Sequence, residues 1–78
     1  MEKVIFKLID NSVIALFPDL VWDSKGSIAS YMHIGQHGGA NPQLIKDYPD
    51  ASIEQFQDLK NELINIGYEL DIKYPLPF

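Results

Sequence analysis

The chain contains no cysteine and no arginine among its 78 residues. The lack of cysteine excludes disulfides, thiolate nucleophiles and thiolate metal sites. Without arginine, no guanidinium can grip a phosphate or a guanine base through two parallel hydrogen bonds. All six basic residues are lysine, and eleven acidic residues outweigh them to give a net charge of −5. We therefore expect no nucleic-acid partner, because clustered positive charge supplies most of that affinity.

Long apolar runs are also missing, since every apolar stretch is interrupted far short of the ~20 residues that span a bilayer. Residues 1–4 do not begin a basic region followed by a long apolar run, so we expect no signal peptide, no membrane partner and a cytoplasmic location. The length fits a single domain over 1–78. Such a domain buries only about 60% of its unfolded surface, which makes a large buried cleft difficult to build without a partner subunit.

Apolar patterning predicts strands in the first half of the chain. Residues 3–9 alternate between apolar and polar, and 13–17 form a continuous apolar run of strand length. The polar residues 10–12 between them are typical of a hairpin turn. We expect Pro18 to end the second strand or to mark a sheet edge. A third strand is predicted over 27–34.

The clearest predicted element is an amphipathic helix near the C-terminus. Its apolar stripe consists of Ile53, Phe56, Leu59, Leu63 and Ile66, at steps of three and four. Ser52 and Gln55 form a capping-box pattern at its start, and Gly67 suits the left-handed position after its end. Residues 68–74 then alternate as a strand with one solvated face.

These elements define an α+β fold, with a small, mostly antiparallel sheet in the order strand-strand-strand-helix-strand and the helix packed on one face. If the last two strands flank the helix as a crossover, they should be parallel and the crossover right-handed. Residues 35–42 hold three glycines and a proline, so we expect neither helix nor regular strand there. For 43–48 the pattern leaves a short strand and an ordered loop open.

The most unusual segment is 31–41, which holds both histidines and three of the five glycines. Functional residues often lie where a rigid strand enters a loop, and glycine lets the backbone approach a ligand or another chain. The alternative is a simple turn whose polar groups satisfy its own backbone. The candidate binding residues are Tyr31, His33, Gly35, Gln36, His37, Gly38, Gly39 and Asn41.

His33 and His37 are the candidate metal ligands. Their spacing would place them on one face of a helix, but the glycines disfavour a helix, and a straight strand would separate them by ~13 Å. A turn at Gly35 could close that gap, yet a tetrahedral site would still need a third ligand. We predict no metal, no cofactor and no catalytic residue. Tyr31 and His33 share a strand face, which leaves acid–base chemistry open beside ordinary packing.

Trp22 is the only tryptophan. An exposed tryptophan would be a typical interface anchor, and the alternative is a core residue that covers a sheet edge.

Three blocks of the chain resemble a family of small uncharacterised bacterial proteins, often from phage-like, plasmid or conjugative regions. The blocks are Ile14-Ala15-Leu16-Phe17-Pro18, then Ser30-Tyr31-Met32-His33-Ile34-Gly35-Gln36-His37-Gly38, and Glu62-Leu63 with Ile66-Gly67-Tyr68. The chain departs from the family over 47–52, where relatives tend to have Thr-x-Pro-Ala-Thr. The resemblance carries no activity and implies only that the glycine-histidine block is a family feature.

Small size, acidity and the lack of a catalytic set favour an intracellular binding module with a protein partner, and the resemblance suggests an accessory of a mobile element. One alternative is a metal-dependent or acid–base enzyme centred on His33 and His37. Another is an acidic nucleic-acid mimic, which would need Asp and Glu aligned along one face. The sequence leaves the activity and the oligomeric state open.

Overall fold

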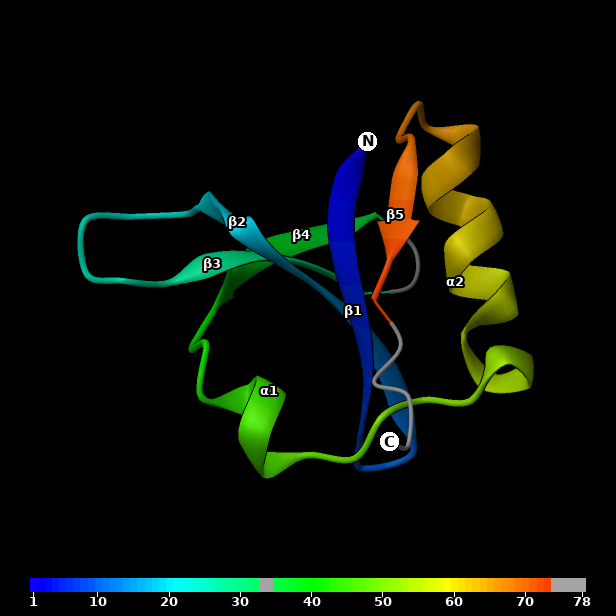
Figure 1. Cartoon of the computed structure of the whole chain (residues 1–78), viewed down its shortest axis with the longest axis horizontal. Coiled ribbons are helices and arrows are strands. Elements are labelled where there is room, and N and C mark those ends of the chain that lie inside the picture. Colours follow the sequence, from blue (N-terminus) through cyan, green and yellow to red (C-terminus); the bar gives the residue numbers. More distant parts are fainter. Residues whose placement is uncertain (33–34, 74–78) are drawn as a thin grey trace.

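The computed structural model describes residues 1–32 and 35–73. In chain order, its elements are β1 (Glu2–Ile9), β2 (Ser12–Val21), β3 (Ile28–Met32), β4 (Gln36–Ala40), α1 (Leu44–Asp47), α2 (Ile53–Asn65) and β5 (Leu70–Ile72). The strands form one sheet in the order β4-β3-β2-β1-β5, in which only the β1–β5 pair is parallel (Figure 1). The predicted α+β fold, a mostly antiparallel sheet with one main helix on a face, is confirmed.

The hairpin between β1 and β2 is tight because Asp10 and Asn11 adopt left-handed backbone, with φ of 49° and 65°. Ile9 pairs with Ser12 directly across this turn. The expectation for Pro18 is wrong, because β2 continues to Val21 and is an inner strand of the sheet. The register between β2 and β3 shifts in this stretch, and such an irregularity accommodates a residue that has no N–H for the ladder.

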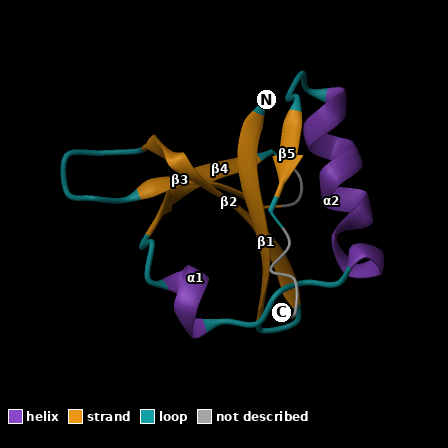
Figure 2. Cartoon of the chain, in the orientation of Figure 1, coloured by secondary structure: helices purple, strands orange, loops and turns teal. Residues whose placement is uncertain are grey.

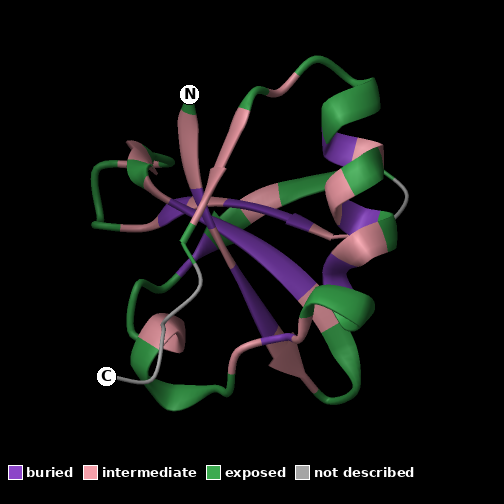
Figure 3. Cartoon of the chain, turned by 45° about the vertical axis from the view of Figure 1, so that its right-hand side comes forward, coloured by how far each residue is buried: buried purple, intermediate pink, exposed green. Residues whose placement is uncertain are grey.

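The main core lies between the sheet and α2. It is built from Val4, Phe6, Ala15, Phe17 and Tyr31 of the strands, with Ala51, Phe56, Leu59 and Leu63 facing them. Figure 3 shows the buried positions gathered on the central strands and on the inner side of α2. Phe6 stacks on Phe56 with ring centroids 4.4 Å apart, which ties the helix to β1. Ile53 and Ile66, at the two ends of the predicted stripe, are instead 59% and 52% exposed.

Both ends of α2 have the predicted caps. The Gln55 N–H donates to Ser52 Oγ (3.2 Å), and the Ser52 N–H donates to Gln55 Oε1 (2.8 Å), so the capping box is complete. Gly67 has φ of +114°, and the Tyr68 N–H donates to the Leu63 carbonyl (3.1 Å) as in a Schellman motif. The start and end of the helix are therefore set by local sequence.

A smaller core lies on the opposite face of the sheet, where α1 packs (Figure 2). Its buried members are Ile14, Leu16, Ile28 and Ala40. Residues 43–48, whose pattern fits a short strand or an ordered loop, form neither, because Leu44–Asp47 is the helix α1. Four residues are too few to display a helical period, which is why patterning gave no sign of this turn of helix.

Two further differences concern strands. The segment expected to be irregular contains β4, which pairs with the whole of β3 from Gln36 to Ala40. The strand expected over 68–74 is shorter, Leu70–Ile72, and it lies beside β1 at the far end of the sheet from β4. The two strands predicted on either side of the helix, β3 and β5, run in the same direction, but β2 and β1 lie between them and β4 precedes α2, so they are not neighbours. No helix in the described part of the chain is long and apolar enough to cross a membrane.

Candidate functional site

The described candidate binding residues lie on or next to the two strands at one edge of the sheet, β3 and β4. Tyr31 lies on β3, Gly35 in the turn, Gln36, His37, Gly38 and Gly39 on β4, and Asn41 just beyond it. His33 falls outside the described residues. Gly35 has φ of +71°, the left-handed conformation that lets the chain reverse between β3 and β4. The block is thus a hairpin edge, not the loop that its glycines suggested.

β4 presents different residues to the two faces of the sheet. His37 pairs with Tyr31, and Gly39 with Ala29, so these residues face α2, because directly opposed residues share a face. The remaining three residues of β4, Gln36, Gly38 and Ala40, face the side on which α1 lies. The contacts of His37 and Gly39 on the α2 side therefore differ from those of Gln36, Gly38 and Ala40 on the α1 side.

On the α2 side, Tyr31 ties the hairpin to the helix. Its hydroxyl donates to the carboxylate of Glu62, and the Gly35 N–H donates to the same hydroxyl (2.9 Å). The hydrogen bond to Glu62, together with burial, raises the pKa of Tyr31 above its usual value near 10. Because the side chain is only 1% exposed and keeps its proton at neutral pH, Tyr31 serves as a structural tie and is not placed to act as a base.

His37 lies outside this tie, on the exposed surface of β4. Its ring meets Tyr31 edge-on, with centroids 4.6 Å apart, and its Nε2 lies 3.2 Å from the Tyr68 hydroxyl. Tyr68 in turn stacks on Phe17, with centroids 5.2 Å apart. His37 therefore has its Nε2 beside Tyr68 and one side of its ring against Tyr31, and the residue is otherwise exposed at the sheet edge.

The structure gives no support within its described residues for a metal centre. Residues 1–32 and 35–73 contain no group of three or more His, Asp or Glu close enough to hold an ion. Ser30, a serine of the same hairpin, is 6% exposed and donates its hydroxyl to the Gly38 carbonyl (3.0 Å). The Ser30 hydroxyl is therefore used in a hydrogen bond that joins β3 to β4.

Trp22 lies directly on the backbone of β4. A Cβ atom built on Gly39 would stand 2.3 Å from Trp22 Cδ1, so only glycine allows this contact. The loop that carries the tryptophan is fixed by Asp23, whose carboxylate accepts the N–H groups of Lys25 (2.9 Å) and Ser27 (3.1 Å). Trp22 covers the sheet edge but is 49% exposed, so it is not a core residue and remains a candidate interface anchor.

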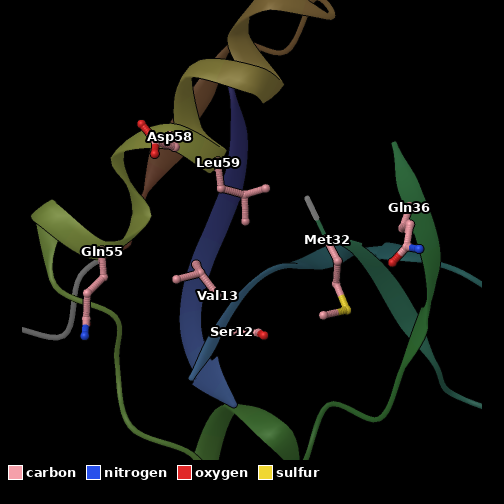
Figure 4. Close-up of a pocket in the computed structure, with 7 residues that line it drawn as sticks. All are labelled: Ser12, Val13, Met32, Gln36, Gln55, Asp58 and Leu59. Carbon is pink, nitrogen blue, oxygen red and sulfur yellow. The ribbon is translucent and has the colours of Figure 1, made fainter. Parts of the chain in front are cut away.

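Sequence reasoning identified none of the hollows beside the hairpin. One is lined by His37, Ile66, Gly67 and Tyr68, and two others share lining residues with each other. Of these two, one lies on the α1 side of β4 and is lined by Ile14, Ser30, Met32, Gln36, His37, Gly38, Gly39, Ala40, Asn41 and Leu44. The other lies between the β1–β2 turn, the β3–β4 hairpin and α2, and is lined by Ser12, Val13, Met32, Gln36, Gln55, Asp58 and Leu59 (Figure 4). Met32 and Gln36 line both hollows, and their positions follow from pairing that no local pattern reveals.

The outer side of β4 is a free sheet edge with respect to the described residues, none of which pairs with it. Natural edges are usually protected by charge, proline, a bulge or short length. β4 has none of the first three, because Gln36–Ala40 is uncharged, lacks proline and pairs with β3 in continuous register. The edge at the other end, β5, has only three residues and carries Asp71 with Lys73 beside it.

Fold and site together define a small α+β domain whose outer strand β4 has no Asp, Glu, Lys or Arg and no pairing partner among the described residues. Comparison of the chain with protein-family models, with curated proteins and with solved structures finds no match. The resemblance of the glycine-histidine block to a family of small bacterial proteins stays a prediction.

Proposed function

We propose that this chain is a small protein-interaction module that binds an extended segment of a partner protein along the outer edge of β4. The observation that carries this proposal is an edge strand of five uncharged residues with no partner among the described ones. A free strand edge offers a row of backbone donors and acceptors, and proteins use such rows to add a strand from another chain.

The two faces beside β4 support the same proposal. Side chains of an added strand would alternate between the faces of the sheet. Those on the α2 side would meet His37 and Trp22, and those on the α1 side would meet the hollow beside Gly38 and Leu44. In strand addition the backbone provides affinity and such pockets provide selectivity.

A protein fits this surface better than a nucleic acid does. Between Lys25 and Lys46 the chain has no Lys and no Arg, so neither of these side chains lies along β4 to hold a phosphate. The cytoplasmic location and the role as an accessory of a mobile element belong to the proposal as well, and the role rests on the family resemblance.

The test is a peptide-display selection with the whole chain as bait, followed by amide hydrogen exchange of the complex. We expect the selected peptides to slow exchange within Gln36–Ala40 when the chain is dilute enough for this edge to be free of a second copy. Gly38→Lys should abolish their binding, because an added strand would bury the new charge. The fold should tolerate this change, since a Cβ at Gly38 meets only Ser30 Oγ at 3.7 Å.

Asn61→Lys is the matched control, because it adds the same charge to an exposed position of α2, outside the α2 residues that face the core. It should leave peptide binding unchanged. Peptides that bind Gly38→Lys as tightly as the wild type, or that slow exchange elsewhere and not in β4, would refute the proposal.

A further inference from the structure

We infer that the strand bound by β4 is the β4 of a second copy of this chain, so that two copies join edge to edge around a twofold axis in one continuous sheet. This inference rests on the proposed function and names the partner for the same edge. It follows from the charge distribution, the register that a twofold axis imposes, and the position of Trp22.

Charge restricts where two copies can meet. Each copy carries a net charge of −5, so an interface that brought acidic surfaces together would be opposed by repulsion. No Asp, Glu, Lys or Arg lies between Lys25 and Lys46, and this uncharged stretch contains both β3 and β4. The hairpin edge is therefore the part of the sheet on which like-charged copies can approach.

A twofold axis fixes the register of the pairing. In such an interface each patch faces its own counterpart, and antiparallel pairing of two identical strands centres on one residue. Centring on Gly38, the midpoint of Gln36–Ala40, places Gly38 opposite Gly38 of the second copy. The same register places His37 opposite Gly39 and Gln36 opposite Ala40 of the second copy. No charged residue and no β-branched side chain lies at the seam.

This register gives Trp22 a partner. Residues directly opposite each other share a face, so His37 would lie beside Gly39 of the second copy on the α2 side. Trp22 of that copy covers this Gly39 and is 49% exposed before association. His37 would thus meet Trp22 across the seam, and symmetry makes the contact twice. Aromatic pairs of this kind are common anchors of interfaces.

The other sheet edge is a poorer partner for β4. Pairing of β4 with β5 would be head-to-tail and would continue from copy to copy as a filament instead of closing. β5 is also short and carries Asp71 with Lys73 next to it, which disfavours addition of an uncharged strand. Closed pairing of β4 with β4 is the arrangement that the residues favour.

The test combines sedimentation equilibrium with cysteine cross-linking, which is simple here because the chain has no cysteine of its own. We expect the wild type to be a dimer. Gly38→Cys should form an intermolecular disulfide under mild oxidation, since opposed residues of antiparallel strands have Cα atoms within the ~4.4–6.8 Å that a disulfide needs. Asn61→Cys, on the exposed side of α2, should not cross-link at the same concentration.

Two further variants test the interface without new bonds. Gly38→Lys places two ammonium groups opposite each other at the axis and should raise the dimer dissociation constant at least about tenfold. Trp22→Ala should also weaken the dimer, while circular dichroism melts confirm that each variant stays folded. A dimer that both changes leave intact, with Gly38→Cys and Asn61→Cys cross-linking equally, would overturn the inference.

A monomeric wild type would also overturn the inferred dimer. The peptide selection would then test the proposed function by itself. If selected peptides still protect β4 in the monomer, strand addition stands and only the second copy is wrong. If no peptide protects β4, both proposals fail.

Discussion

Single residues connect the outer layers of this domain to its sheet. Lys7 lies on β1 with 6% of its side chain exposed, and its Nζ is 2.7 Å from Asp50 Oδ1 in the segment between α1 and α2. The same segment forms an isolated bridge with β1 at these two residues. This ion pair fixes the path of the chain from one face of the sheet to the other.

Asp50→Asn should therefore lower the free energy of unfolding by about 3 kcal/mol, because it leaves the buried ammonium without its counter-charge. Urea denaturation measures the loss. Asp19→Asn is the matched control, since the pair of Asp19 with Lys3 is solvent-exposed (62% and 41%) and 3.6 Å long. It should change stability by less than about 1 kcal/mol. Equal losses for the two variants would contradict this role for Lys7.

The hydroxyl of Tyr31 gives a stability that depends on pH. Its pKa in the folded chain is raised above the ordinary value of 10.0, chiefly by the hydrogen bond to Glu62. A raised pKa means that the folded state holds the proton more tightly than the unfolded state. The stabilisation is then fully present below pH ~10 and is lost as the pH rises through the folded pKa.

Tyr31→Phe should accordingly be less stable than the wild type at neutral pH, and the difference should shrink in alkaline solution. Thermal melts of both proteins between neutral pH and pH ~11 measure this difference. A difference that is independent of pH would show that the hydroxyl does not bond the Glu62 carboxylate.

At the scale of elements, α2 shows how local sequence determines a boundary. Ser52→Ala should cost about 1 kcal/mol, because it removes the oxygen that accepts the Gln55 N–H at the helix start. Ser24→Ala, at an exposed position in the β2–β3 connection, should cost almost nothing. Chemical denaturation with no loss for Ser52→Ala would remove the cap as the reason for the helix start.

The contact of Trp22 with the backbone of β4 at Gly39 joins the β2–β3 connection to β4. Gly39→Ala should displace the tryptophan, because the new Cβ would stand 2.3 Å from Cδ1. We expect a change in the fluorescence of this sole tryptophan and a loss of about 1–3 kcal/mol, as for other overpacked sites. Gly38→Ala is the matched control with ordinary 3.7 Å contact, and it should leave the emission unchanged. The same emission from both variants would contradict this contact between Trp22 and Gly39.

Elements with a repeating side-chain pattern or a capping residue could be predicted from the sequence. Elements that form only by pairing with a neighbouring strand could not. The helix from Ile53 and the first three strands follow from local periodicity, and Gly67 marks the helix end. β4 could not be predicted because its glycine-rich residues carry no alternation, and it exists through pairing with β3. The contact of Trp22 with Gly39 depends in addition on the register shift within β2.

At the scale of the whole molecule, the glycine-histidine segment was predicted to be important, but its geometry was not. The sequence leaves a recognition loop and a simple turn open, whereas the fold makes Gln36–Ala40 of this segment the outermost strand of the sheet. Because the segment lies at the edge of the sheet, its lack of Asp, Glu, Lys and Arg leaves that edge without charged side chains of these types. Three acidic residues outside the hairpin, Asp19, Asp50 and Asp71, pair with lysines, while the edge itself carries no charge.

The most direct test of strand addition at β4 is the hydrogen exchange of its backbone amides in the wild-type chain, measured at low and at high protein concentration. Pairing with a second copy predicts that amides within Gln36–Ala40 exchange more slowly as concentration rises, while those of Leu70–Ile72 in β5 do not change. Exchange in β4 that is independent of concentration and unaffected by any selected peptide would contradict both the dimer and the role of β4 as a binding edge.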